Sequence, residues 1–167
     1  MEIYKNKLLM VKEQNFKYNE NISCTTKAVD FIRNIIKIQN EPEEVFTLIG
    51  LDAKNNILGF SEVSRGTLSS SLTTGREIFK RAILMNCSKI LLTHNHPSGD
   101  ATPSACDVKI TENIKEISNL FDIQVIDHII IGDKEDYSII YNSIIGGNKN
   151  DRSWKLQKCR KSKNPSK

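Results

Sequence analysis

The stretch over residues 90–121 constrains the fold of this chain most strongly. A short apolar run, residues 90–93, ends at the polar segment His-Asn-His-Pro-Ser-Gly-Asp of residues 94–100, and a helix is predicted to begin at Ser104. Apolar residues of that helix recur at spacings of four, three and four, the period of a helix with one buried face: Ile110, Ile114, Ile117 and Phe121. Strand, polar loop and helix in this order indicate an α/β fold, in which functional side chains gather in loops at strand ends.

The flanking segments predict further strands and helices around this unit. On the N-terminal side we expect a strand over 3–11, a helix over 26–38, a hairpin of strands 45–51 and 57–64, and a helix from a Thr74/Glu77 capping box to Asn86. Strands over 123–131 and 137–141 are expected to close the domain. The chain has 167 residues, 38% of them apolar, which suits one domain. We place that domain at 25–147, after an N-terminal strand and linker at 1–24.

The C-terminal end, residues 148–167, differs in charge from the rest of the chain. It holds eight Lys or Arg residues against the single acid Asp151, within a formal net charge of +4. A basic segment that also contains Pro and Ser buries little apolar surface, so a disordered tail is predicted. Such a tail can act as a solubilising appendage or can contact nucleic acid, and the sequence leaves both readings open.

Cysteine usage and hydropathy indicate the compartment. The four cysteines form no CxxC pair, which argues against a disulfide framework and against a cysteine-rich zinc knuckle: Cys24, Cys87, Cys106 and Cys159. The N-terminus shows no signal-like apolar stretch, and no run approaches membrane-spanning length. We therefore expect a cytoplasmic protein that does not bind membranes.

His94, His96 and Asp107 form a candidate metal site. Two histidines two residues apart project to the same side of an extended segment, and Pro97 favours an extended conformation at His96. Asp107, in the first turn of the following helix, can supply a third ligand. Two imidazoles and a carboxylate suit zinc better than magnesium or calcium. Three protein ligands leave a fourth position for water, the arrangement of catalytic zinc sites, and one Zn²⁺ ion is predicted.

Glu62 and Ser104 are the candidate catalytic partners of that ion. Period two places Glu62 on one strand face with Leu58 and Phe60, where partial desolvation would raise the pKa of its carboxyl toward that of a general base. Ser104 can donate a hydrogen bond to a developing oxyanion. Each residue also has a structural reading, because Ser104 and Asp107 make a capping box and Glu62 alone is compatible with an ordinary surface carboxylate.

The ordered set Glu62, His94-x-His96-Pro97, Ser104-x-x-Asp107 resembles the JAMM motif of JAB/MPN-domain metalloproteases. The short motifs around it resemble those of RadC-like proteins, and this resemblance extends over residues 26–142: Arg65-Gly66-Thr67, Gly75-Arg76-Glu77, Thr102-Pro103-Ser104 and the DHIIIG of 127–132. The resemblance implies a cytidine deaminase-like mixed sheet flanked by helices, zinc on the two histidines and the aspartate, and cleavage of a peptide or isopeptide bond with Glu62 as general acid/base. The substrate would be a peptide or protein.

Several departures and rival readings limit that resemblance. Residues 1–25 are too short for the helix-hairpin-helix DNA module expected of longer RadC proteins. Asn95 stands where deubiquitinating relatives have Ser or Thr, and the PCxxC motif of zinc deaminases is absent. The serious alternative is a non-enzymatic or DNA-associated accessory protein that binds nucleic acid through residues 148–167. Asp127 and His128 can support a metal ligand or form a buried structural pair, and the second reading is favoured from the sequence.

Overall fold

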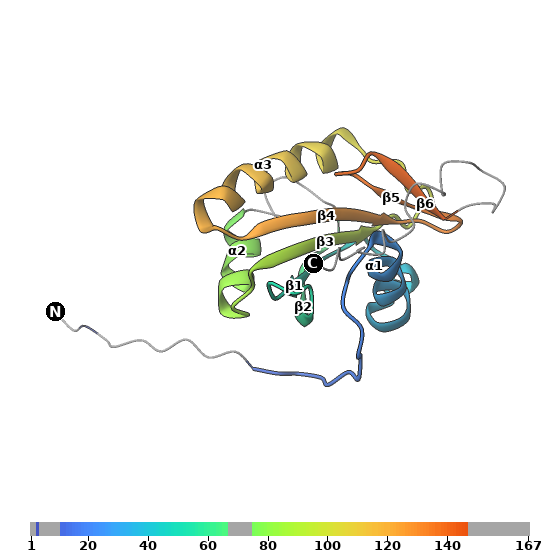
Figure 1. Ribbon diagram of the computed structural model, residues 1–167. Coiled ribbons are helices and arrows are strands. Elements are labelled where there is room, and N and C mark those ends of the chain that lie inside the picture. Colours follow the sequence, from blue (N-terminus) through green and yellow to red (C-terminus); the bar gives the residue numbers. More distant parts are fainter. Residues whose placement is uncertain (1–2, 4–10, 67–74, 147–167) are drawn as a thin grey trace, which may run out of the picture.

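The computed structural model describes Ile3, residues 11–66 and residues 75–146 (Figure 1). Six strands form one mixed sheet in the order β2-β1-β3-β4-β5-β6. Their bounds are β1 Val45–Leu51, β2 Ile57–Arg65, β3 Lys89–Asn95, β4 Gln124–Ile131, β5 Glu135–Ser138 and β6 Ser143–Gly146. Only β3 and β4 pair in parallel among these strands, and α3 (Ala105–Phe121) connects them. The predicted α/β architecture, a mixed sheet flanked by helices, is confirmed.

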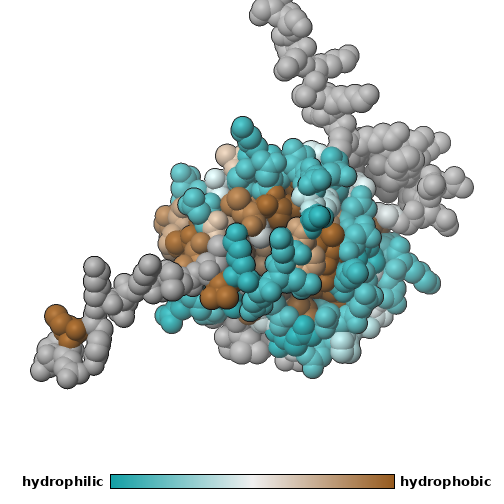
Figure 2. All heavy atoms as spheres, turned by 90° about the horizontal axis from the view of Figure 1, so that it is seen from below, coloured by the Kyte–Doolittle hydropathy of each residue, from teal (hydrophilic) through white to brown (hydrophobic). Residues whose placement is uncertain are grey.

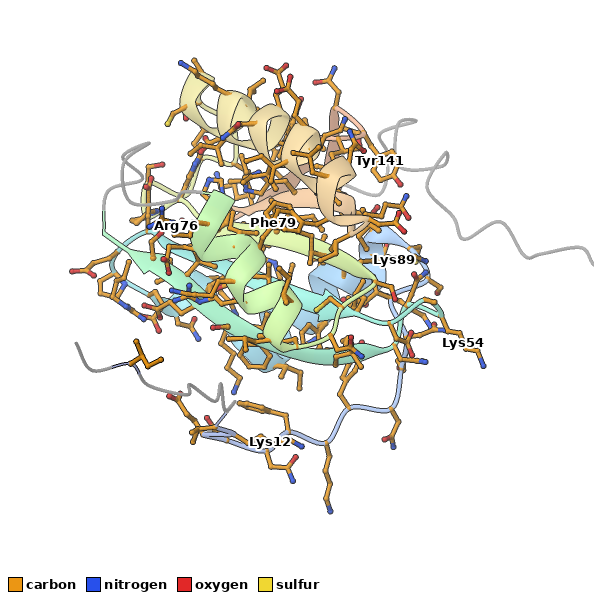
Figure 3. The ribbon with its side chains drawn as sticks, turned by 90° about the vertical axis from the view of Figure 1, so that its left-hand side faces the viewer. Lys12, Lys54, Arg76, Phe79, Lys89 and Tyr141 are labelled. Atoms are coloured by element: carbon orange, nitrogen blue, oxygen red, sulfur yellow. The ribbon has the colours of Figure 1, made fainter. Side chains whose placement is uncertain are left out.

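Helices cover both faces of the sheet. Helix α1 (Thr25–Phe31) continues into a π-helical turn over Ile32–Ile36 and lies on one face, whereas α2 (Gly75–Leu84) and α3 lie on the other (Figure 1). Two apolar clusters result, called here the α1-side core and the α3-side core. Phe79 lies between α2 and α3 in the α3-side core, stacked at 5.0 Å on Phe121 (Figure 3).

The N-terminal segment before α1 packs on the α1 side through aromatic rings. Phe16 contacts Phe60 of β2 at 5.3 Å between ring centroids, and Tyr18 contacts Phe31 of α1 edge-on at 4.9 Å. Figure 2 views the molecule from below the orientation of Figure 1, and the apolar surface on this side is interleaved with polar side chains. No helix among residues 11–66 and 75–146 has the length and apolar character needed to cross a membrane.

Arg33 joins the α1 side to the β4–β5 turn. Its guanidinium donates to both carboxylate oxygens of Asp136, at 3.1 and 2.6 Å, and to the carbonyl of Gly132 at 2.6 Å. Asp136 is almost fully buried, and burial raises the pKa of its carboxyl although Arg33 pulls it down. This bidentate pair fixes the end of β4, which lies beside the candidate site.

Most predicted elements are confirmed, with shifted ends. The predicted helix over 26–38 is α1 plus the π-helical turn, and β3 extends two residues beyond the predicted 90–93 because His94 and Asn95 are buried. The predicted strand over 137–141 is wrong beyond Ser138, where a turn leads into β6; this turn includes Asn142, whose φ is 49°. Three predictions lie outside the described residues: the strand over 3–11 apart from Ile3 and Val11, Thr74 of the capping box, and the basic segment 148–167.

Candidate metal centre

The two histidines of the predicted site lie at the carboxyl end of β3. Strand β3 is buried in the middle of the sheet, so the side chain of His94 enters the α3-side core, where it is fully buried and stacks on Phe46 with ring centroids 6.0 Å apart. His96 follows the strand, and its backbone N–H still bonds to the carbonyl of Ile131 in β4. The sheet therefore holds both imidazoles from the backbone.

Asp107 reaches the same point from the start of α3. Ser104 caps this helix: its hydroxyl accepts from the Asp107 N–H at 3.2 Å, and the Asp107 carboxylate accepts from the Ser104 N–H at 2.7 Å. The Ser104 hydroxyl also donates to Asp107 Oδ2 at 2.6 Å. Two of these contacts orient the carboxylate, which is 2% exposed. Ser104 is partnered with the candidate ligand, and the capping box read from the sequence is confirmed.

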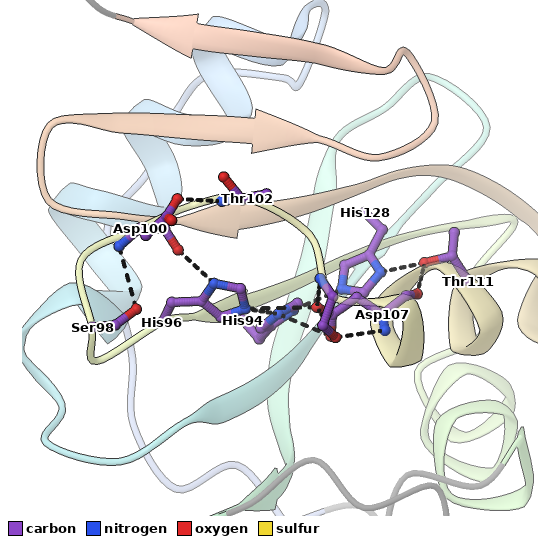
Figure 4. Close-up of polar contacts among 9 residues, drawn as sticks. His94, His96, Ser98, Asp100, Thr102, Asp107, Thr111 and His128 are labelled. Carbon is purple, nitrogen blue, oxygen red and sulfur yellow. Dashed lines mark hydrogen bonds and ion pairs between the residues drawn. The ribbon is translucent and has the colours of Figure 1, made fainter.

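Three candidate ligand atoms converge, as Figure 4 shows. The Nε2 atoms of His94 and His96 are 3.0 Å apart, and they lie 3.3 and 3.6 Å from Oδ1 and Oδ2 of Asp107, respectively. Zinc bonds of about 2.0–2.2 Å at tetrahedral angles require ligand atoms roughly 3.3 Å apart. One ligand atom from each residue lies within 4.8 Å of the other two, so this His94–His96–Asp107 group could hold one zinc-sized ion.

Hydrogen bonds at the far side of each imidazole free its Nε2 lone pair. His96 Nδ1 donates to the carbonyl of Asp100 at 2.6 Å, and His94 Nδ1 lies 2.9 Å from Nε2 of His128 (Figure 4). A carbonyl only accepts, so Nδ1 of His96 carries the proton. Two nitrogens and a carboxylate at such close range repel one another unless a cation lies between them or a proton sits on His96 Nε2.

The ionisation states also suit a metal site. Burial, reinforced by the neighbouring His128, lowers the pKa of His94 well below its usual value, so this imidazole is neutral at neutral pH. Burial by itself would raise the pKa of Asp107, but contacts with His96, His94 and Ser104 outweigh it and hold that pKa well below the usual range. His96 differs, because its hydrogen bond with Asp107 raises its pKa and favours a protonated ring that a bound ion would have to deprotonate. Neutral imidazole and ionised carboxylate are the forms that bind zinc.

The structure does not bring Glu62 to this cluster. Glu62 pairs with Thr47 of β1, which pairs with Thr93 of β3, so by alternation these three side chains share the sheet face opposite to His94. Irregular pairing at both ends of β2 disrupts the expected period, and Leu58 is 48% exposed. The Glu62 side chain is 45% exposed and forms an ion pair with Arg65 at 2.8 Å. This is not the desolvated position that the sequence pattern predicted.

Glu44 is the carboxylate that the sequence pattern missed. It directly precedes β1, whose N-terminal end lies beside the C-terminal end of β3 in the antiparallel pair, and its charge contributes to raising the pKa of His96. Asn95, between the two histidines, holds this segment: Oδ1 accepts from the Val45 N–H at 2.8 Å and Nδ2 donates to the Glu43 carbonyl at 2.9 Å. The sequence offered one signal for Glu44: it is an acidic residue directly before β1, the strand that pairs with the strand carrying the two histidines.

A small cavity of about 140 Å³ adjoins the cluster through His96. Its other walls come from the loop before β1 and from the end of β4: Gln39, Glu41, Pro42, Asn95, Pro97, Ile131, Gly132 and Asp133. A larger concavity of about 750 Å³, along α3 and the start of β4, shares no residue with the cluster. We therefore associate the smaller one with the chemistry, since it shares a candidate ligand.

Comparisons with known proteins agree with this geometry. A family model described as RadC-like JAB domain matches residues 22–144. UPF0758 proteins are similar: that of Pseudomonas syringae pv. tomato is 40% identical over 116 residues, 68% of this chain and 52% of that protein. That of Clostridium beijerinckii is 45% identical over 103 residues, 62% of this chain and 45% of that protein. This chain thus spans about half the length of these curated relatives. Together with the mixed sheet and the His-His-Asp cluster, the match shows that the chain belongs to the RadC-like JAB domain family.

Proposed function

We propose that this domain is a zinc-dependent hydrolase, a metallopeptidase that cleaves a peptide or isopeptide bond. One observation carries the proposal: the Nε2 atoms of His94 and His96 and the carboxylate of Asp107 meet within bonding range of a single ion. These three residues would hold zinc, which supplies a Lewis acid and lowers the pKa of a water molecule to roughly 7. The choice of a peptide bond comes from the resemblance to JAMM proteases.

Glu44 is the general base in this proposal, in preference to Glu62. A base must reach the water beside the ion, and Glu44 lies close enough to His96 to influence its pKa, while Glu62 belongs to the opposite face of the sheet. The Glu44 carboxylate would take the proton of the attacking water and return it to the leaving amine. Asn95 keeps Glu44 in place by holding Val45, the next residue along the chain.

Ser104 has a different part from the one expected from the sequence. Its hydroxyl donates to Asp107 Oδ2, so it orients a ligand and keeps the carboxylate ionised. With Oδ2 engaged in this way, Oδ1 of Asp107 lies 3.3 Å from His94 Nε2 and would be free to bind the ion. Donation to a developing oxyanion would need this hydrogen bond to break, so we assign Ser104 to ligand orientation.

Three single variants test the proposal on the zinc-loaded protein. Glu44→Gln, Glu62→Gln and Glu43→Gln would be assayed for zinc content and for cleavage of a mixed peptide library read by mass spectrometry. Glu43 is an exposed neighbour and serves as the matched control. We expect Glu44→Gln to retain zinc and to lose about 10²- to 10⁴-fold in turnover, the usual contribution of a general base. The other two variants should cleave like the parent protein.

Other outcomes would refute distinct parts of the proposal. Loss of turnover in Glu62→Gln, with Glu44→Gln unaffected, would return the base to Glu62. Cleavage that persists after zinc is removed by a chelator would exclude the metal from the reaction. Zinc binding with no cleavage of any peptide by the parent would refute the peptidase assignment and leave a metal-binding accessory protein.

A further inference from the structure

A chain of hydrogen bonds runs from the candidate ligand His94 to the carbonyl of the candidate ligand Asp107. His94 Nδ1 lies 2.9 Å from His128 Nε2, and His128 Nδ1 lies 2.6 Å from the hydroxyl of Thr111. That hydroxyl lies 2.6 Å from the Asp107 carbonyl, one helical turn earlier in α3 (Figure 4). His128 and Thr111 are 0% and 2% exposed, so solvent does not compete for these bonds.

The direction of every bond follows from the carbonyl at the end of the chain. A carbonyl only accepts, so the single hydroxyl proton of Thr111 points to Asp107. The Thr111 oxygen must then accept from the N–H at His128 Nδ1. Full burial disfavours a charged imidazolium at His128, which leaves Nε2 of His128 as a lone pair that accepts from His94 Nδ1. His94 therefore carries its proton on Nδ1.

We propose that Thr111, acting through His128, is a positioning residue that holds His94 in the Nδ1–H tautomer, so that Nε2 presents a lone pair to the metal ion. This inference rests on the metal centre proposed above and adds two residues to it. Histidine ligands commonly donate their second N–H to a carboxylate, a backbone carbonyl or water. Here the acceptor is the neutral imidazole of His128, so the relay places no carboxylate directly behind His94 and a bound ion would keep more of its positive charge.

The relay links both ends of the site. Thr111 belongs to the helix that carries Asp107, whereas His128 belongs to β4, the parallel neighbour of the strand that carries His94. The relay thus fixes the tautomer of one ligand from the helix that supplies another. Without the Thr111 hydroxyl, the N–H at His128 Nδ1 would have no acceptor, which favours moving that proton to Nε2. His94 Nδ1 would then have to accept, and a proton on His94 Nε2 would block the metal.

Thr111→Val, Thr111→Ser and Thr93→Val would test the relay on the full chain. Valine keeps the shape of threonine and removes the hydroxyl, and serine restores it. Thr93 is the matched control, a fully buried threonine next to His94 whose hydroxyl has no hydrogen-bond partner within residues 11–66 and 75–146. Two readouts are needed: the zinc dissociation constant by competition with a chromogenic chelator, and the histidine tautomers of the metal-free protein by long-range ¹H–¹⁵N NMR.

We expect Thr111→Val to weaken zinc binding about 10- to 100-fold, the usual effect of losing a partner behind a metal ligand. Its metal-free NMR spectrum should show His94 protonated at Nε2, whereas the parent, Thr111→Ser and Thr93→Val should show protonation at Nδ1. A Thr111→Val protein with the parental tautomer and affinity would overturn the relay. A parent that binds no zinc would refute the metal centre, while the tautomers of that same metal-free protein would still decide the relay.

Discussion

The side chain of Asn95 offers the sharpest test of how the site is held together. It is 2% exposed and lies between the two candidate ligands in sequence. Its three hydrogen bonds go to backbone groups at the start of β1 and in the segment before it: the Val45 N–H at 2.8 Å, the Glu43 carbonyl at 2.9 Å and the Glu41 carbonyl at 3.3 Å. Asn95→Ala removes all three bonds. It removes no side-chain contact with the candidate metal ligands.

The expected cost follows from those bonds. Val45 is 3% exposed, so its N–H would be left buried without an acceptor, which costs about 1–3 kcal/mol. Losing the bond to the Glu43 carbonyl adds about 1 kcal/mol. The bond at 3.3 Å is long and contributes little. We expect the free energy of unfolding to fall by roughly 2–4 kcal/mol.

Function should respond more selectively than stability. Because Asn95 and His94 project to opposite faces of β3, the ligands stay in place and zinc is retained, whereas Glu44 loses the clamp that positions it and turnover falls. Urea unfolding, zinc content and peptide turnover would be measured beside Asn113→Ala, an exposed asparagine on α3 that serves as the control. A destabilisation below about 1 kcal/mol would contradict the clamp. Loss of zinc in step with turnover would contradict the separation of clamp and ligands.

Two further predictions concern buried carboxylates. Arg33→Ala should lower the free energy of unfolding by about 3 kcal/mol, because it leaves the buried Asp136 carboxylate without its cation. Asp136→Asn should lower it by less, because the Arg33 side chain reaches solvent. Chemical denaturation of both variants checks this order. Burial raises the pKa of Asp127 to about 6, so the folded state binds a proton more readily than the unfolded state. As the pH rises from roughly 4 to 6, the parent should therefore lose up to about 3 kcal/mol in free energy of unfolding relative to Asp127→Asn, and the difference should stay constant at higher pH. Equal pH dependence of the two unfolding free energies would contradict this.

Local patterns in the sequence predicted the helix and strand that supply the ligands. The four-three-four spacing and the Ser104 capping box defined α3, because both signals lie within a few residues of chain. The end of β3 was placed too early because His94 and Asn95 are polar, and polar residues usually end a buried strand. Both are buried here because their side chains find hydrogen-bond partners away from β3: His128 of β4 for His94, and Val45 of β1 and Glu43 before it for Asn95.

Long-range pairing explains what the sequence could not provide. Glu62 was assigned from period two, but β2 pairs irregularly at Val63, where the register shifts between Phe46 and Thr47. Glu44 lies far from the histidines along the chain, and only the antiparallel pairing of β1 with β3 brings it close. The sequence favours a buried structural role for His128, because its contact with His94 depends on the parallel pairing of β3 with β4.

The chain segment between two of the ligands gives the site a mechanical role as well. His94 lies near the end of the central strand β3 and Asp107 lies in the first turn of α3, and they are 13 residues apart in the sequence. An ion bound to both would act as a cross-link that closes this loop and removes conformational freedom from the unfolded chain. Proteolysis within residues 97–103 should therefore slow as zinc is added. The rate of cleavage in this segment would then measure the occupancy of the site without any substrate.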